Sequence, residues 1–194
     1  MTIQQIFALA IATILSSNVV LSKPWGICSF LGVSKKKSSA LGMGVAVLIV
    51  LVLASLVTWL IYNYVLVPFD VKFLDIVVFI LVIATLVQLL EMVLKKFFPS
   101  LYKVLGIYLP LITTNCAILG VALEATGNNY DLAKTMVYAV SAGLGYMLVI
   151  FIFSGIRERI ETAPVPKPFK GIAIALIIAG FMAMAFAEGF KGIA

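Results

Sequence analysis

The sequence predicts an all-α membrane protein with six transmembrane helices, arranged as two inverted three-helix repeats whose first helices are both broken. Three observations support this fold class. Of the 194 residues, 63% are hydrophobic and 11% are charged, and the mean hydropathy is +1.20, which is far from the balance of soluble domains. The apolar residues form continuous runs rather than the alternating pattern of a transmembrane β-barrel. The motif Cys-x-x-Leu-Gly-Val occurs at Cys28 and again 88 residues later at Cys116.

The length of the chain fits six crossings, because one helix needs about 20 residues to span the hydrocarbon core. This leaves no room for a soluble domain, so residues 1–194 are expected to form a single membrane domain, with one repeat in 1–97 and the other in 98–194. The six apolar segments cover residues 3–33, 40–67, 74–94, 104–123, 132–155 and 171–187.

The first and fourth segments both contain residues that interrupt a helix. The first is too long for one straight crossing and includes Ser16–Asn18 and Lys23–Gly26, whose proline, glycine and short polar side chains remove or compete for helical hydrogen bonds. The fourth has Pro110 followed by Thr113–Asn115, immediately before Cys116, and these polar groups can satisfy backbone atoms freed by unwinding. We therefore expect a broken helix at the start of each half.

The spacing to charged residues predicts how deep the two thiols lie. Cys28 is seven residues before Lys35, and Cys116 is eight residues before Glu124. At about 1.5 Å per helical residue, each cysteine lies roughly 10 to 12 Å from its charged boundary, whereas half of the hydrocarbon core is about 15 Å. Both thiols are expected near mid-membrane, approached from opposite sides as in the discontinuous helices of inverted-repeat transporters.

Basic residues predict the orientation of the chain in the membrane. They gather after the first, third and fifth apolar segments, whereas the other connections carry few. By the positive-inside rule, these three loops face the cytoplasm and both termini face outward. The net charge of +6 is thus a signal of orientation rather than of nucleic-acid binding. With three crossings per half, the second repeat enters the membrane inverted.

Small residues recur at the same stage of each half. They occupy Ser39–Gly44 in the first half and Ser141–Tyr146 in the second. Small side chains allow two helix backbones to approach closely, so these two stretches are expected at helix contacts.

The two cysteines have three competing interpretations. The first is that they are small hydrophobic core residues, as most buried cysteines are. The second is a structural disulfide, which is disfavoured because helices open to the cytoplasm lie in a reducing environment. The third is metal binding, because thiolates select iron–sulfur clusters or zinc. Cys28 and Cys116 are the only cysteines and stand at equivalent positions of the two halves, which favours metal binding. A four-thiolate site then needs two more cysteines from a partner such as a homologous membrane subunit.

A [2Fe–2S] centre in a membrane needs hydrogen-bond donors and positive potential, because its negative charge is costly in a low dielectric. Each cysteine is at or near the start of the half-helix that follows it, where free N–H groups and the helix dipole favour the thiolate. Lys23, the only charged residue in the first apolar stretch, adds to this field or, alternatively, snorkels from the helix break. With such a centre, the function becomes electron transfer through the membrane.

Three stretches carry a resemblance to a known family: Gly106–Ala117 around the second cysteine, Gly32–Lys36 after the first, and Gly155–Arg159 in the last basic loop. Over essentially the whole chain, the sequence resembles the A-type subunit of the Rnf ion-translocating ferredoxin:NAD oxidoreductase and its counterpart, the E-type subunit of the sodium-pumping NADH:quinone oxidoreductase. Thr114 beside Asn115, and the continuation Leu119–Ala122, are more similar to the Rnf member.

The resemblance implies a subunit of a redox-driven ion pump in the bacterial cytoplasmic (inner) membrane. It implies pairing with the homologous E-type subunit of the Rnf complex to hold an intramembrane [2Fe–2S] cluster, with Cys28 and Cys116 as this chain's iron ligands. Other Rnf subunits, carrying flavins and iron–sulfur clusters, then pass electrons between ferredoxin and NAD while sodium ions or protons cross the membrane. The sequence has no dinucleotide-binding glycine fingerprint, flavin-attachment motif or ferredoxin-type cysteine run. We therefore expect no complete active site in this chain alone.

Ion movement needs polar groups within the membrane. Apart from Asp75 at the edge of the third segment, Glu91 is the only acidic residue inside a predicted span, one turn after Gln88, and is a candidate ion gate. The pattern Gln-x-x-Glu-Met at this place is typical of the resembled family. Alternatively, Glu91 forms a helix-end ion pair with Lys95, worth about a few tenths of a kcal/mol. Four other residues offer oxygen atoms to an ion or, alternatively, cap unwound helix ends: Asn18, Thr113, Thr114 and Asn115.

Two functions without redox chemistry remain as alternatives. Inverted repeats with broken helices also occur in small secondary transporters, which would have the same pattern without the cysteines. A structural anchor for other subunits is the other alternative. It is favoured if replacing both cysteines by serine leaves assembly and electron transfer intact.

Overall fold

In the computed structural model, the described part of the chain is mostly helical and contains no strand, which confirms the all-α class. The structure describes residues 3–15, 17–34, 37–69, 72–97, 109–161, 166 and 170–189. A π-helical turn, Tyr62–Leu66, continues the third helix, and a short 3₁₀ turn, Lys72–Leu74, precedes the fourth. The α-helices are α1 (Ile3–Ile14), α2 (Ile27–Val33), α3 (Lys37–Ile61), α4 (Asp75–Phe97), α6 (Leu109–Thr113), α7 (Cys116–Gly127), α8 (Leu132–Glu161) and α9 (Ile172–Gly189).

Both predicted helix breaks are present. The first separates α1 from α2, and the second separates α6 from α7 at Thr114 and Asn115. Pro24 has no N–H to donate, and Gly26, just before α2, has a left-handed backbone with φ of +84°. Asn115 is extended, with φ of −73° and ψ of 111°, so the chain cannot continue as one helix. Local residues therefore set both breaks.

Three of the described helical segments are long and apolar enough to cross a membrane. They are Lys37–Leu66, Asp75–Val93 and Leu132–Ile160, and Ile172–Phe186 is a shorter apolar helix. They correspond to the second, third, fifth and sixth predicted segments. The start of the fourth predicted segment, at residue 104, lies outside the described residues. The chain is thus a helical membrane protein, and the count of six crossings stays a prediction.

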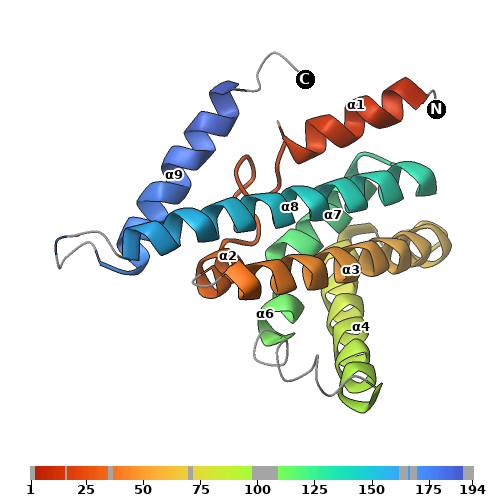
Figure 1. Cartoon of the computed structure of the whole chain (residues 1–194). Coiled ribbons are helices and arrows are strands. Elements are labelled where there is room, and N and C mark those ends of the chain that lie inside the picture. Colours follow the sequence, from red (N-terminus) through yellow and green to blue (C-terminus); the bar gives the residue numbers. More distant parts are fainter. Residues whose placement is uncertain are drawn as a thin grey trace.

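α3 and α8 form the centre of the molecule and run antiparallel along each other (Figure 1). Small residues let the two backbones meet. A Cβ atom added to Gly44 would lie 2.6 Å from Met147 Cγ, and one added to Gly143 would lie 3.0 Å from Leu48 Cγ. Each of the two small-residue stretches predicted to lie at helix contacts thus has a glycine in this interface, packed against a larger side chain of the other helix.

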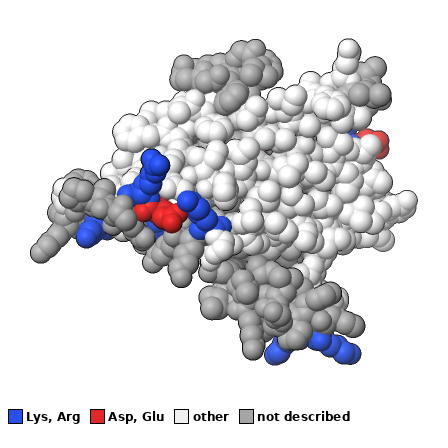
Figure 2. All heavy atoms as spheres, in the orientation of Figure 1, with Lys and Arg blue, Asp and Glu red and all other residues white. Residues whose placement is uncertain are grey.

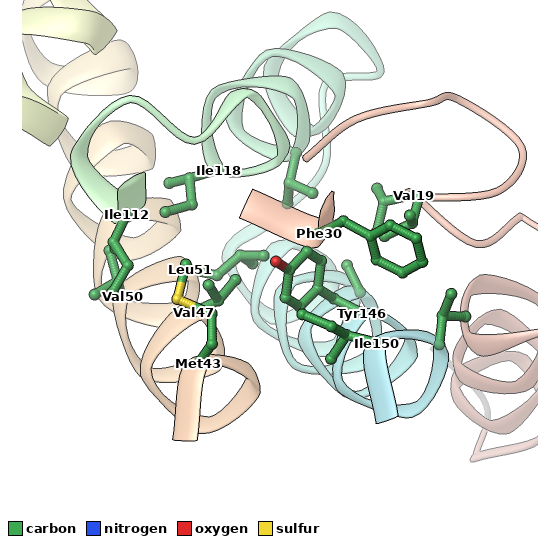
Figure 3. Close-up of a cluster of buried hydrophobic side chains, with 14 of the residues drawn as sticks. Val19, Phe30, Met43, Val47, Val50, Leu51, Ile112, Ile118, Tyr146 and Ile150 are labelled. Carbon is green, nitrogen blue, oxygen red and sulfur yellow. The ribbon is translucent and has the colours of Figure 1, made fainter. Parts of the chain in front are cut away.

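The broken helices pack on this central pair. α1 packs against α8, and α7 packs against α3. Figure 3 shows Phe30 of α2 beside Tyr146 of α8, with Ile118 of α7 facing the side chains of α3. The ring of Phe30 also lies against Phe153, with 4.3 Å between ring centroids. The buried core thus fixes α2 and α7, the two helices that carry the cysteines.

α4 runs across the direction of α3 and α8 (Figure 1), and its basic end lies apart from the C-terminal end of α8. The molecular surface in Figure 2 is broadly uncharged, with charged side chains at its margins. Such a surface suits a lipid environment. Because the basic ends of α4 and α8 are not side by side, a common cytoplasmic side for the three basic loops stays a prediction.

Candidate functional site

The two cysteines stand at the beginnings of the helices that follow the two breaks. Cys116 is the first residue of α7, and Cys28 is the second residue of α2. Both thiols are free, and both residues are exposed. The structure therefore does not support a disulfide between the two cysteines. It also does not support the interpretation that they are packed in the core.

A hydrogen bond links the two cysteine segments directly. The backbone N–H of Gly26 donates to Cys116 Sγ at 2.9 Å, and Gly26 lies two residues before Cys28. A Cβ atom on Gly26 would lie 3.1 Å from a ring carbon of Tyr146 and 3.2 Å from Ala117 Cβ. With its left-handed φ, this position requires glycine for both backbone and space. Segments 90 residues apart are thus brought to one place.

The residue before Cys116 is bonded to the residue after Cys28. Asn115 caps α7, because its Oδ1 accepts from the N–H of Ala117 at 3.1 Å. Its Nδ2 donates to Ser29 Oγ at 3.3 Å. Both side chains are buried. A single buried contact therefore holds the flanking residues of the two cysteines together.

Tyr146 completes this buried network from α8. The hydroxyls of Ser29 and Tyr146 are 2.8 Å apart, and Ser29 Oγ also donates to the carbonyl of Gly26 at 2.9 Å. A serine has one hydroxyl proton, so the Tyr146 hydroxyl donates to Ser29. Ser29 and Tyr146 were not predicted as site residues, although each lies in a stretch that the repeats singled out.

Lys23 pairs with Glu124 of α7, and its ammonium lies 5.2 Å from the centroid of the Trp25 ring. The other carboxylate oxygen of Glu124 accepts from the Tyr138 hydroxyl at 2.5 Å. Glu124 lies inside α7, and its side chain is only 20% exposed. An acid can be held there because a lysine and a hydroxyl compensate it. The charge of Lys23 is correspondingly balanced by Glu124.

The other polar candidates bond to nearby backbone groups. Asn18 is fully buried, donates to the carbonyl of Ile14 at 2.9 Å and accepts from the N–H of Val20 at 3.1 Å. Thr114 donates to the carbonyl of Pro110 at 3.0 Å. These bonds, like the cap made by Asn115, satisfy backbone groups at helix ends. Capping of helix ends is the role that the sequence left open as the alternative to ion binding.

Two candidates lie at the ends of helices. Thr113 is the last residue of α6. Glu91 is half-buried in the last two turns of α4, at the same helix end as Lys95 and Lys96. Whether Glu91 lies on an ion path stays a prediction.

The arrangement fits a metal shared with another chain. Among the described residues, no group of three or more histidine, cysteine or acidic side chains gathers, so this part of the chain offers two thiols. A donor to the sulfur atom, as Gly26 provides, stabilises thiolate ligands and tunes the metal they bind. Because both cysteines are exposed, ligands from a second protein can reach the same metal.

Comparison with known proteins places the whole chain among membrane subunits. A family described as "Rnf-Nqr subunit, membrane protein" matches residues 6–194. A relative from Acetobacterium woodii, named as the A-type subunit of the Na(+)-translocating ferredoxin:NAD(+) oxidoreductase complex, is 53% identical over 182 residues, 94% of each chain. Relatives from Azoarcus sp. and Actinobacillus pleuropneumoniae, both named as the A-type subunit of an ion-translocating oxidoreductase complex, are 52% identical over 185 residues, 95% of each chain.

Proposed function

Because the chain belongs to the Rnf-Nqr family of membrane subunits, we propose that it binds half of a [2Fe–2S] cluster that relays electrons across the membrane in a redox-driven ion pump. Cys28 and Cys116 are this chain's ligands to iron. The names of the relatives, subunits of ion-translocating oxidoreductases, support the wider role. The observation that carries the proposal is the Gly26 hydrogen bond to Cys116 Sγ, which joins the two cysteine segments.

The residues of the chain have distinct tasks in this function. When bound, the cluster accepts and releases one electron at a time. Gly26 holds the Cys116 sulfur and stabilises its negative charge with a backbone N–H. The hydrogen bond between Asn115 and Ser29 keeps the two cysteine-bearing helices at a fixed separation, and Tyr146 anchors Ser29 to α8. The pair of thiols is therefore preorganised before metal binds.

The second pair of ligands comes from the partner protein. The homologous E-type subunit of the Rnf complex is the proposed partner, with two cysteines of its own, and the exposure of Cys28 and Cys116 allows it to reach the metal. Other Rnf subunits with flavins and iron–sulfur clusters connect this site to ferredoxin and NAD. The relative from Acetobacterium woodii is named for sodium transport, which supports sodium as the transported ion, with Glu91 as the candidate residue on its path.

The proposed topology is six crossings in two inverted repeats, in the bacterial inner membrane with both termini outside. The order of elements supports this, because each half has a broken helix followed by two further helices. In addition, α1 of the first half packs on α8 of the second, and α7 of the second half packs on α3 of the first. In an inverted repeat, equivalent helices run in opposite directions, as α3 and α8 do in Figure 1.

The test is a measurement of iron, sulfide and the electron paramagnetic resonance (EPR) signal in the purified pair of this chain and its homologous partner. We expect about two irons and a reducible signal in the wild type, both lost in Cys28→Ser and in Cys116→Ser. Size-exclusion chromatography checks that the variant pairs still assemble. A wild-type pair without iron contradicts the proposal and favours a transporter. A double serine variant with intact assembly and electron transfer favours a structural anchor.

A further inference from the structure

A buried arginine contacts the end of the short helix that carries Cys28. Arg157, in α8, is only 7% exposed, although arginine is rarely buried unless its guanidinium is paired. Its Nη1 donates to the carbonyl oxygen of Leu31 at 2.7 Å and to Ser34 Oγ at 2.8 Å. From the sequence, this arginine was expected only to be a basic loop residue. Its contact with α2 is seen only in the structure.

These contacts fall where α2 needs support. α2 has seven residues, too few for a helix that is stable by itself, and its last carbonyl groups have no partners within the helix. Leu31 is in its last turn, and Ser34 is the residue that ends it. One turn before Arg157 on α8, Phe153 packs against Phe30. The same stretch of α8 therefore holds α2 by ring packing and by the guanidinium.

Arg157 also brings a positive charge to the helix that carries Cys28. Cys28 is three residues before Leu31, a rise of about 4.5 Å along the helix. The two atoms that Arg157 binds, a carbonyl oxygen and a hydroxyl oxygen, are uncharged. By contrast, Lys23 is paired with a carboxylate. In a low dielectric, a positive charge held against the helix that carries a metal ligand favours the more negative form of the metal centre.

We propose that Arg157 is a positioning residue that fixes Cys28 for iron binding and, through its charge, favours the reduced cluster. This inference rests on the proposed function, because it assigns a role at the same site. In the protein without metal, the guanidinium likewise holds the C-terminal end of α2.

Four variants separate the effect of Arg157 on the position of α2 from the effect of its charge on the cluster. Arg157→Gln removes the charge and the planar donor group, and Arg157→Lys keeps the charge but loses the planar group. Ser34→Ala removes one of the two contacts and leaves the guanidinium in place. Lys37→Gln is the matched control. It removes a positive charge beside the same part of α8, from an ion pair with Glu158 at 2.8 Å whose side chains are 54% and 58% exposed.

Two readouts apply to these variants in the purified pair of subunits. The first is hydrogen–deuterium exchange of residues 27–34 in metal-free protein, compared with α7. The second is the midpoint potential of the cluster from EPR-monitored titration. In Arg157→Gln, we expect exchange of α2 to rise about ten-fold, with α7 unchanged. We also expect about a ten-fold shift toward the oxidised form, about 59 mV for one electron. Arg157→Lys raises exchange with a smaller potential shift, and Lys37→Gln changes neither.

The inference is overturned if Arg157→Gln has wild-type exchange and potential, or if Lys37→Gln shifts the potential equally. If Arg157→Gln does not assemble, Ser34→Ala provides the test of whether the arginine holds α2. We expect hydrogen–deuterium exchange of α2 in Ser34→Ala to rise about three-fold. Wild-type exchange in this variant would contradict the inference. A wild-type pair that contains no iron overturns the proposed function instead. The exchange measurement on metal-free protein then still decides whether Arg157 holds α2.

Discussion

At the scale of single residues, Gly26 has a larger effect on the site than its size suggests. Its N–H binds one cysteine sulfur, its carbonyl accepts from Ser29, and it immediately precedes the helix that carries the other cysteine. A glycine in a lysine-proline-tryptophan-glycine stretch is readily predicted to break a helix. That its N–H points at a sulfur atom 90 residues away depends on tertiary packing and could not be predicted from the sequence.

Gly26→Ala is therefore expected to reduce iron binding as well as stability. The left-handed backbone costs a side chain about 1 to 2 kcal/mol, and the new Cβ meets Tyr146 and Ala117 at 3.1 and 3.2 Å. The matched control is Gly171→Ala, because Gly171 also has positive φ, +96°, but nothing lies within 4 Å of its Cβ position. Iron content per assembled pair measures the effect. Equal iron in the two variants would contradict the role of Gly26.

At the scale of elements, the break between α1 and α2 is held against α7. Trp25 lies so close to Gly120 that an added Cβ would come within 2.4 Å of its ring. The small residue in the second Cys-x-x-Leu-Gly-Val motif thus accommodates the loop of the other half. The sequence predicted the two breaks, because proline and short polar residues act locally, but it did not predict this contact between them.

Gly120→Ala is expected to force Trp25 away from α7 and to destabilise the protein by about 1 to 3 kcal/mol, the usual cost of overfilling a core. Gly127→Ala, in the same helix, has open space around the new Cβ and is expected to be neutral or stabilising by up to about 1 kcal/mol. Thermal unfolding in detergent compares the two. A loss of stability in Gly127→Ala as large as in Gly120→Ala would contradict the role of the Trp25 contact.

The ion pair between Lys23 and Glu124 links the same loop to α7, with side chains 34% and 20% exposed. Lys23→Met leaves a partly buried carboxylate without its cation and should cost about 1 to 3 kcal/mol, between the values for exposed and buried pairs. The double variant Lys23→Met with Glu124→Gln should recover most of this loss, because no lone charge remains. A double-mutant cycle of unfolding free energies measures the coupling, and additive losses would mean that the pair contributes nothing.

At the scale of the whole molecule, composition and the spacing of apolar runs predicted the helical membrane class, and the small-residue stretches predicted helix contacts without naming the partner helices. These features depend on local composition and periodicity. The pairing of Glu124 with Lys23, which is 101 residues away, could not be predicted from local sequence. The roles of Tyr146 and Arg157 likewise depend on contacts between the two halves, which one sequence does not display.

The central claim, that two free thiols of this chain hold one half of an iron–sulfur cluster, has one most direct measurement. It is the position of iron in an experimental structure of the two-subunit pair, identified by anomalous scattering at the iron edge. We predict iron density between the sulfur atoms of Cys28 and Cys116 and two cysteines of the partner. Sulfur atoms too far apart to share a cluster, or adjacent sulfur atoms with no iron between the two proteins, would contradict it.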